Sequence, residues 1–360
     1  MGKKEVYLDY AASAPLYAKS ADAMRNAVDF STGNPSSSNF AGRKSNVVIE
    51  QARRNIADLL HCSSKNIVFT SSGTESIYLG IYNICKQHRP CSVVTSLFEH
   101  DAVLKAVTNA AECFSIPVIH LENETWNHDA LLQLDNQLEN NTFSLLCLAH
   151  VNHLTGNLLP VKEIGKLCQK HHCLFFCNMI QTVGKYDIHL SELPIDFAAA
   201  SAHKFGGAKG IGLFYHKQQI HPFLQGENQE RNMRAGIENI YGICGMEAAL
   251  QESIESLSDN QKHIASIKSY CAEQLTNHFP AIQFVSDTEK GLYNLLSFYF
   301  PKQNMENIYI QLDIASIAVS LYFEKRKEQS FLRLSFGGQT TREDIDYFII
   351  TLSNILINTK

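Results

Sequence analysis

Short apolar runs alternate with amphipathic stretches between residues 66 and 216 of the chain. Runs of this length predict buried β-strands, and the stretches between them predict helices that begin near Thr74, near Glu99 and at about residue 161. Strands that alternate with helices predict a mainly parallel, seven-stranded sheet with helices on both faces. The seven runs are NIVFTSS, SVVTS, IPVIHL, FSLLCLAHV, CLFFCN, DFAAASA and GIGLFYH.

The pattern changes after about residue 245. A long helical stretch over residues 245–275 is followed by short apolar strands and by a closing helix over residues 341–357. This order predicts a second, smaller α+β domain. We therefore predict an α/β fold in which residues 16–245 form the large domain. The small domain combines residues 1–15 with residues 246–360.

Polar residues and glycine gather where five of the predicted strands end. In a parallel sheet the carboxyl ends of the strands meet at one edge, which is where the active sites of such folds lie. We therefore expect these segments to converge on one crevice. They are TSSGTES (70–76), SLFEH (96–100), HVNH (150–153), NMIQ (178–181) and SAHK (201–204).

Composition and charge exclude several classes of partner. The net charge is −5 and no basic block is longer than EKRK at 324–327, which argues against nucleic acid and anionic membranes as partners. No signal-peptide core and no run of about eighteen apolar residues is present. We expect a soluble, cytoplasmic protein. Its ten cysteines are expected to be reduced thiols rather than a disulfide framework.

Lys204 is the first candidate for chemistry. It ends an apolar, alanine-rich stretch that precedes several glycines, where burial would lower the pKa of its amine and make it a nucleophile. Ser201 and His203 lie beside it as candidate phosphate contacts. A lysine beside a phosphate site suggests pyridoxal 5′-phosphate, because the aldehyde of that cofactor reacts with an amine. Taken alone, Lys204 would simply end a strand.

Gly73 and Thr74 lie at a predicted turn from strand to helix. Backbone N–H groups and a hydroxyl would face outward there, at the positive end of a helix, which suits a phosphate group. The alternative is an ordinary helix cap with Glu75 in the first turn. The segment alone does not decide between these two interpretations.

His100 and Arg333 are candidates of the same kind. His100 follows a strand and opens a helix, where an imidazole could stack on a flat cofactor and transfer protons near neutral pH. The alternative is a surface histidine at a helix start. Arg333 lies in a run of alternating apolar and polar residues, where its guanidinium could bind a substrate carboxylate or form a structural ion pair.

The segment CQKHHCLFFC (168–177) raises the question of a metal site. In an extended strand Cys173, Phe175 and Cys177 would share one face, and no second CxxC pair completes a tetrahedral ligand set. We therefore predict buried thiols in this segment and no metal site.

Taken in order, these motifs resemble those of the cysteine desulfurase family, within the class V aminotransferase group of fold-type I pyridoxal-phosphate enzymes. The resemblance spans nearly the whole chain and is specific because many segments match in the same order. It rests on YLDYAASAP (7–15), GNPSS (33–37), VFTSSGTES (68–76), EHDAVL (99–104), HVNHLTG (150–156), QTVGK (181–185), SAHKFGGAKGIG (201–212), ERNMRAGIEN (230–239) and LRLSFG (332–337).

The resemblance implies a homodimer that binds pyridoxal 5′-phosphate, takes sulfur from L-cysteine and leaves alanine and a persulfide on a mobile-loop cysteine. A sulfur-acceptor protein would be a further partner. Lys204 would be the Schiff-base lysine, His100 would stack on the ring and Gln181 would contact its phenolic oxygen. The cofactor-binding residues would be Gly73, Thr74, Asn178, Gln181, Ser201, His203 and Lys204, and the substrate-binding residues Asn152, His153 and Arg333.

Four features depart from the family pattern. Residues 321–332 are much shorter than the segment that carries the persulfide cysteine in the family, and no cysteine follows Cys271. Asn178 replaces the aspartate that pairs with the pyridine nitrogen, so it could donate a hydrogen bond there but not keep that nitrogen protonated. His153 replaces the second asparagine of an HVNN motif. Ile237 replaces a threonine that would reach the phosphate bound to the partner subunit.

These departures lead us to expect altered chemistry. We predict a lyase-type reaction on L-cysteine or a related amino acid, without a persulfide cysteine. The retention of Lys204, His100, Gln181 and Arg333 supports an active enzyme. Two alternatives stay open: a catalytically degenerate dimeric scaffold or partner-binding protein of the same fold, and a class V aminotransferase.

Overall fold

The computed structural model divides the chain into two compact units. Unit 1 consists of Met1–Ala14, Val151–Leu158 and Ser256–Lys360, and unit 2 of Pro15–His150 and Leu159–Glu255. The division falls after Glu255 rather than near residue 245, because the helix that ends there packs on other helices of unit 2. The structure describes residues 4–30, 33–141, 143–219, 221–222, 224–324 and 327–358.

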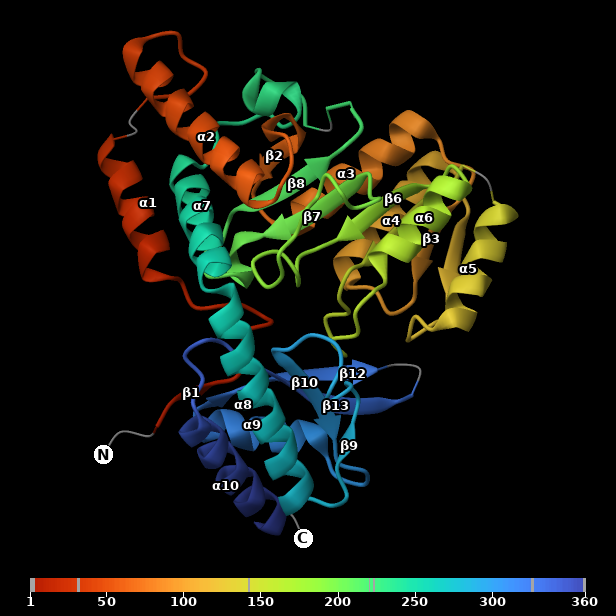
Figure 1. The fold of residues 1–360 in the computed structure, drawn as a ribbon, viewed down its shortest axis with the longest axis vertical. Coiled ribbons are helices and arrows are strands. Elements are labelled where there is room, and N and C mark those ends of the chain that lie inside the picture. The colour runs from red at the N-terminus through yellow and green to blue at the C-terminus, as the bar shows by residue number, and fades with distance from the viewer. Residues whose placement is uncertain are drawn as a thin grey trace. The chain divides into compact units, whose positions relative to one another are not determined.

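Unit 2 is built on a seven-stranded sheet (Figure 1). Its strands are β2 (Ile67–Thr70), β3 (Val93–Ser96), β4 (Val118–Leu121), β5 (Leu145–Ala149), β6 (Leu174–Asn178), β7 (Phe197–Ser201) and β8 (Gly212–His216). The order is β2-β8-β7-β6-β5-β3-β4. Only β8 runs antiparallel to its neighbours, and every other pairing is parallel. The predicted mainly parallel sheet is confirmed.

Helices cover both faces of this sheet, which explains why its strands are apolar on both sides. One face packs against α3 (Gly73–His88) and α4 (Asp101–Phe114). The other face packs against α2 (Phe40–Leu59), α5 (His128–Glu139), α6 (Val161–Lys170) and α7 (Ile240–Glu255), and α1 (Ala18–Phe30) packs on α7.

The cysteines of β6 follow this division between the two faces. Cys173, Phe175 and Cys177 lie in one apolar core, and Leu174 and Phe176 lie in the other. The predicted common face of the first three residues is confirmed.

Unit 1 is an α+β unit with its own apolar core. It contains a four-stranded antiparallel sheet of order β12-β13-β10-β9 and a two-stranded parallel sheet of β1 and β11. Its strands are β1 (Val6–Tyr7), β9 (Gln283–Phe284), β10 (Leu295–Tyr299), β11 (Ile317–Ala318), β12 (Ser320–Glu324) and β13 (Gln329–Ser335). Its helices are α8 (Leu257–His278), α9 (Met305–Ile314) and α10 (Arg342–Asn358).

The single helix predicted over residues 245–275 is therefore two helices, α7 and α8, which meet at Ser256 and belong to different units. Three short 3₁₀ turns complete the elements: η1 (Ser64–Asn66), η2 (Ala202–Lys204) and η3 (Gln229–Asn232). Within the part of the chain that the structure describes, no helix combines the length and apolar character needed to cross a membrane.

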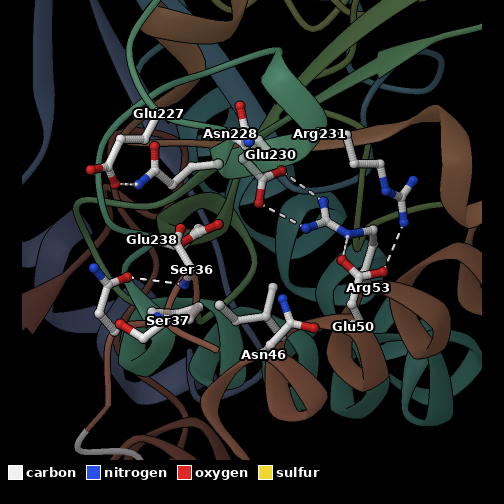
Figure 2. A pocket seen from close by; sticks show the side chains of 14 residues that line it. Ser36, Ser37, Asn46, Glu50, Arg53, Glu227, Asn228, Glu230, Arg231 and Glu238 are labelled. Carbon is white, nitrogen blue, oxygen red and sulfur yellow. Dashed lines mark hydrogen bonds and ion pairs between the residues drawn. The ribbon is translucent and has the colours of Figure 1, made fainter. Parts of the chain in front are cut away.

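A buried ion pair closes the free edge of the large sheet at β2. Arg53 and Glu230 share two N–H···O bonds of 2.7 Å (Figure 2), and their side chains are 2% and 1% exposed. Glu230 also accepts the N–H of Phe69 at 2.7 Å, and Arg53 donates to the C=O of Ile67 at 3.0 Å. Two side chains thus pair backbone groups of an edge strand that would otherwise lack partners.

The backbone around Glu230 is strained to make this contact. Glu230, Arg231 and Asn232 all have left-handed φ values, of 47°, 57° and 66°. Each non-glycine residue in that region costs free energy, so the conformation persists only where the surroundings determine it. The bidentate bond to Arg53 is one such determinant.

Replacing Arg53 by alanine leaves the Glu230 carboxylate buried without its partner. We expect Arg53→Ala to lower the free energy of unfolding by about 3–5 kcal/mol, measured by urea denaturation. Arg231→Ala is the matched control, because Arg231 pairs with Glu50 at 2.8 Å through an exposed guanidinium. That variant should cost about 1 kcal/mol or less. Equal losses in the two variants would contradict the assignment of the buried pair as the critical one.

Candidate functional site

The predicted segments begin at strand ends that share one edge of the sheet in unit 2. Strands β2, β3, β5, β6 and β7 run in the same direction, so their carboxyl ends lie on the same side. The HVNH segment is divided: His150 lies in unit 2, and Asn152 and His153 lie in unit 1 together with Arg333. The convergence of strand ends is thus a property of unit 2.

Close packing at Gly73 brings three of the segments together. A Cβ atom on Gly73 would lie 2.4 Å from Cδ1 of Ile180 and 3.2 Å from Cβ of Ser201. A larger residue at position 73 would require the Ile180 side chain to move, so glycine suits this close approach of α3 to the ends of β6 and β7. Segments 70–76, 178–181 and 201–204 are therefore neighbours in space.

The first turn of α3 is a set of hydrogen-bond donors. Ser72 caps the helix, and its Oγ accepts the N–H of Glu75 at 3.1 Å. Helix geometry gives the N–H groups of Gly73 and Thr74 no acceptor within the helix, and Thr74 is exposed. The helix-cap interpretation is therefore confirmed. Phosphate binding by the N–H groups at this positive helix end stays a prediction.

Glu75 does not cancel the positive character of this helix end. Its carboxylate accepts a 2.7 Å bond from Nε of Arg234 and a 2.7 Å bond from the N–H of Ser71. Burial opposes ionisation of Glu75, but these bonds outweigh it and lower the pKa of the carboxyl. The charge of Glu75 is thus offset by Arg234.

Three lysines surround His203 at the end of β7. Its Nδ1 lies 2.9 Å from Oγ of Ser201. Burial, followed by the charges of Lys204, Lys209 and Lys185, lowers the pKa of His203 to about 4, so the ring is neutral at neutral pH. The charges of these three lysines act on His203, and the positive end of α3 packs on the neighbouring Ser201. Both effects favour an anion. This donor set fits the phosphate group of the predicted cofactor.

Two buried amides lie at the end of β6 and in the turn after it. Asn178 is 7% exposed and its Oδ1 accepts the N–H of Ile180 at 3.2 Å. Gln181 is 6% exposed and its Oε1 accepts from Nζ of Lys185 at 2.8 Å. Because the carbonyl oxygen of Asn178 already has a donor, this side chain can meet a ligand through its NH₂ group. Contact of Gln181 with a cofactor stays a prediction.

His100 is the N-terminal cap of α4. Its Nδ1 accepts the N–H of Ala102 at 3.0 Å, which places the ring proton on Nε2. The side chain is exposed, in keeping with the helix-start alternative. Its predicted stacking on a cofactor stays a prediction.

Glu99 is a candidate that the sequence analysis did not single out. Its Oε1 accepts the N–H of Ala149 at 2.7 Å, and its Oε2 is buried with no partner among the described residues. Burial raises the pKa of Glu99 to about 8, from an ordinary value of 4.5. A glutamate directly after an apolar strand was the signal available in the sequence.

His150 supplies a second buried polar atom at this end of β5. Its Nδ1 has no partner within the described part of the chain, and burial lowers the pKa of the imidazole to about 4. A buried polar atom without a partner points to a missing ligand or water. The buried polar atoms of His150 and Glu99 thus indicate that a polar ligand or a water molecule could form hydrogen bonds at these strand ends.

Arg333 forms a structural ion pair within unit 1. It contacts Asp9 at 3.1 Å, donates to the carbonyl of His153 at 2.8 Å and to Ser320 at 3.1 Å, and lies over the ring of Tyr322. Its Nε is buried and has no acceptor among the described residues. The Nε–H group of Arg333 could therefore donate a hydrogen bond to a carboxylate.

Asn152 stabilises its own turn. Its Oδ1 accepts the N–H groups of Leu154 and Thr155, both at 2.9 Å. This bond pattern is typical of an Asx turn. Substrate binding by Asn152 and His153 stays a prediction.

Strands β12 and β13 form a hairpin over the segment that the sequence predicts to be short. Strands β12 and β13 pair from Ser320↔Arg333 to Glu324↔Gln329. Residues 325–328 connect them, and residues 325–326 of the predicted short segment 321–332 lie outside the described residues. The last cysteine in the sequence, Cys271, is buried in α8.

The sequence profile of aminotransferase class V matches residues 6–348. The chain belongs to the aminotransferase class-V family.

Curated relatives of this family match over nearly the full chain. The cysteine desulfurase IscS of Dictyoglomus turgidum (strain DSM 6724 / Z-1310) is 30% identical over 98% of this chain and 95% of its own length. The putative cysteine desulfurase IscS 1 of Bacillus subtilis (strain 168) is 31% identical over 88% of this chain and 84% of its own length. The chain is thus similar to cysteine desulfurases in the coarse sense that the motifs predict.

Solved structures agree with the fold. A NifS-like protein superposes with a TM-score of 0.92 at 28% identity, covering 98% of this chain and 99% of that one. A NifS-like protein from Rickettsia africae ESF-5 superposes with a TM-score of 0.89 at 26% identity, covering 98% and 99%. The predicted fold class, fold type I, is confirmed.

Two more of the segments that carry the family resemblance line a cavity of about 550 Å³ in unit 2 (Figure 2). The cavity lies between residues 34–53, which include most of the GNPSS segment, and residues 227–238, which include most of ERNMRAGIEN. Glu238 in its lining has a buried Oε2 without a partner among the described residues. None of the predicted cofactor-binding residues lines this cavity.

We expect Glu99→Gln to change the pH dependence of stability. Between about pH 5 and pH 8 the folded chain keeps a proton on Glu99 that the unfolded chain has released, so this group makes stability fall as pH rises. Glutamine has no such proton. The free energy of unfolding of Glu99→Gln minus that of the wild type should therefore increase with pH, by up to about 1.4 kcal/mol per pH unit in this window. Urea denaturation at several pH values measures it.

Glu112→Gln is the control for this measurement, because Glu112 is an exposed glutamate on α4. Its stability should stay at a constant offset from the wild type across the same pH range. Parallel profiles for Glu99→Gln and the wild type would show that the Glu99 carboxyl ionises normally.

Proposed function

We propose that the chain is a pyridoxal 5′-phosphate enzyme that acts on L-cysteine or a related amino acid by a lyase-type route. The observation that carries the proposal is the cluster at the carboxyl ends of β2, β6 and β7. There the start of α3 packs on Ser201, and His203 lies among Lys204, Lys185 and Lys209. Membership of the aminotransferase class-V family supports this assignment.

The residues present suit the cofactor in three ways. The donors of Gly73, Thr74, Ser201 and His203 would hold the phosphate at the positive end of α3. The NH₂ groups of Asn178 and Gln181 would face the ring nitrogen and the phenolic oxygen, where acceptors are expected. The amine of Lys204 would bind the aldehyde, and His100 would cover the ring.

Pyridoxal 5′-phosphate, when bound, supplies an electron-accepting ring for bond cleavage at the α-carbon and β-carbon of an amino acid. The chain supplies positioning and proton transfer. Lys204 is held on the short turn η2 directly after β7, where its Nζ would carry a proton to and from the substrate. His203, neutral at working pH, contributes a hydrogen bond rather than a charge.

Asn178 changes the electronics of such a site. Its NH₂ group would donate to an unprotonated ring nitrogen, whereas a carboxylate there would favour the protonated form. An unprotonated ring is a weaker electron acceptor. This supports a reaction with modest demands on carbanion stabilisation, such as elimination of a good leaving group from the β-carbon.

The route we propose does not use a persulfide on the chain. The β12–β13 hairpin contains no cysteine, and Cys271 is buried with a pKa raised by burial, which suppresses the reactive thiolate. In the elimination, the Cβ–Sγ bond of the substrate would break and sulfur would leave as sulfide. In the alternative, a thiolate of a sulfur-acceptor protein would attack Sγ, and the same bond would break to leave alanine and a persulfide on the acceptor. Arg333, through its unpaired Nε, would bind the substrate carboxylate.

The proposal includes a homodimer. Val28, Phe30, Phe40 and Val47 on α1 and α2 are 53–79% exposed. Apolar side chains gathered on neighbouring helices are typical of a surface that another chain covers. A second copy of the chain is the occupant we propose.

The second candidate function is a catalytically degenerate dimeric scaffold or partner-binding protein. Asn178 at the predicted ring nitrogen and the hairpin without a cysteine favour it. A class V aminotransferase is the third. Turnover separates the candidates: sulfide release from L-cysteine, lost in Lys204→Ala, excludes the scaffold, and transfer of the amino group to a keto acid would favour the aminotransferase.

We expect pyridoxal 5′-phosphate to attach to Lys204. The purified chain is mixed with the cofactor and reduced with borohydride, and the labelled peptide is identified by mass spectrometry. Lys204→Ala should lose the label and the visible absorbance of the bound cofactor. Lys166→Ala is the control, because Lys166 is an exposed lysine on α6 outside this cluster, and it should keep both. A label on Lys185 or Lys209 would contradict the assignment.

We expect Asn178→Asp to shift the pH dependence of the bound cofactor's absorbance. A carboxylate beside the ring nitrogen should raise the pKa of that nitrogen by about 1–3 units. Turnover should rise with it, because the ring becomes a better electron acceptor. Asn109→Asp is the control, since Asn109 is an exposed asparagine on α4 with no predicted role in the site. An unchanged titration in Asn178→Asp would show that this residue does not touch the ring nitrogen.

A further inference from the structure

We infer that His61, Asp187 and His189 form a surface site for one divalent transition-metal ion of the zinc type. Among the described residues, these are the side chains whose ligand atoms gather in a metal-sized group, all lying within 4.8 Å of one another. All three lie in unit 2. The sequence analysis predicts no metal site, and this group escapes it because His61 is far from the other two in the chain.

The ligand atoms face one another around a single carboxylate. Nε2 of His189 lies 3.3 Å from Oδ2 of Asp187, and Nε2 of His61 lies 3.9 Å from Oδ1 of the same residue. The two imidazole rings are stacked, with centroids 3.8 Å apart and planes inclined by 20°. Because an imidazole nitrogen binds a metal in the plane of its ring, the two rings would rotate out of this stack to bind one ion together with Asp187.

A fourth residue orients one of the ligands. Oε1 of Glu192 lies 3.3 Å from Nδ1 of His189. A histidine that binds a metal through one nitrogen usually donates the other N–H to a carboxylate, which fixes the tautomer and strengthens the ligand. Glu192 therefore directs Nε2 of His189 toward Asp187 and His61.

The backbone holds the two halves of the site together. The N–H of Ser191 donates to the carbonyl of His61 at 3.2 Å, its Oγ donates to the same carbonyl at 2.6 Å, and the N–H of Leu190 donates to Leu60 at 3.0 Å. These bonds join the end of α2 to the segment that follows Lys185. The site is thus assembled by backbone contacts before any ion arrives.

The side chains of Asp187 and His189 point to solvent because the residues that alternate with them are buried. Ile188 and Leu190 are 4% and 1% exposed and belong to the apolar core. Asp187 and His189, which alternate with them, therefore point to solvent on the same side of the segment. Their exposed side chains leave the site open to an incoming ion.

His61 occupies a backbone position that usually takes glycine. It directly follows the cap of α2 and has a φ of 49°. A left-handed residue after a helix end is most often glycine, and a histidine there carries a conformational cost. Binding of an ion by its imidazole would offset that cost.

The ligand set selects the class of ion. Two imidazoles and one carboxylate suit Zn²⁺, Co²⁺ or Ni²⁺, whereas Mg²⁺ and Ca²⁺ prefer oxygen ligands throughout. Three protein ligands leave a fourth position for water. An ion here would tie α2 to the segment that begins at Lys185, whose amine holds Gln181. The site does not depend on the proposed cofactor or reaction.

The test uses the full chain, stripped with a chelator and titrated with Zn²⁺ against a chromophoric competitor. We expect about one equivalent to bind, and to raise the melting temperature, where Mg²⁺ and Ca²⁺ have no such effect. His61→Ala and His189→Ala should weaken binding at least about 100-fold. Glu192→Gln should weaken it about 10–100-fold, the usual effect of losing such a supporting carboxylate. His128→Ala is the control for an exposed histidine outside the site.

Co²⁺ absorbance identifies the ligands independently. Nitrogen and oxygen ligands give visible bands alone, whereas the exposed thiols Cys91 and Cys113 would add a sulfur charge-transfer band. Unchanged affinity in both His61→Ala and His189→Ala, or a sulfur band in the wild type that accounts for the bound ion, would overturn the proposal. All four substitutions are at the surface, and circular dichroism confirms that each variant is folded before binding is compared.

Discussion

The structure of unit 2 depends on the buried bond between Arg53 and Glu230. It pairs the backbone of the edge strand β2 at Ile67 and Phe69, and β2 leads after two residues into the cap of α3. The segment that carries Glu230 also carries Arg234, which binds Glu75 in the first turn of α3. One short segment therefore holds the chain on both sides of the turn that presents Gly73 and Thr74. The place of the predicted phosphate site follows from this arrangement.

Most of the fold of unit 2 could be predicted because strands buried on both faces must be apolar runs, and such runs are visible without knowledge of their neighbours. A prediction of one continuous helix over residues 245–275 passes over Ser256, Ser258 and Asp259, which favour a helix start rather than a helix interior. In the structure α7 ends at Glu255 and α8 begins at Leu257. By contrast, the assignment of Val151–Leu158 to unit 1 has no mark in composition, since it is decided by tertiary contacts.

The same contrast between local sequence patterns and tertiary contacts applies to the candidate site. Ser201, His203 and Lys204 could be selected from the sequence because they are adjacent in one motif. The partners that change their properties come from elsewhere: Lys185 and Lys209 act on His203, and the N–H of Ala149 binds Glu99. The pair of Arg333 with Asp9 joins opposite ends of the chain. Local patterns thus name the chemical groups, while charge and burial are set by residues that only the fold brings near.

The distribution of thiols in the fold has a consequence for how the chain would handle reactive sulfur. Of ten cysteines, Cys91 and Cys113 are exposed, Cys62 and Cys244 are half-buried, and the other six are enclosed in the apolar cores. In the folded molecule, oxidants and alkylating agents therefore reach Cys91 and Cys113 most readily, while the six enclosed thiols are shielded from them.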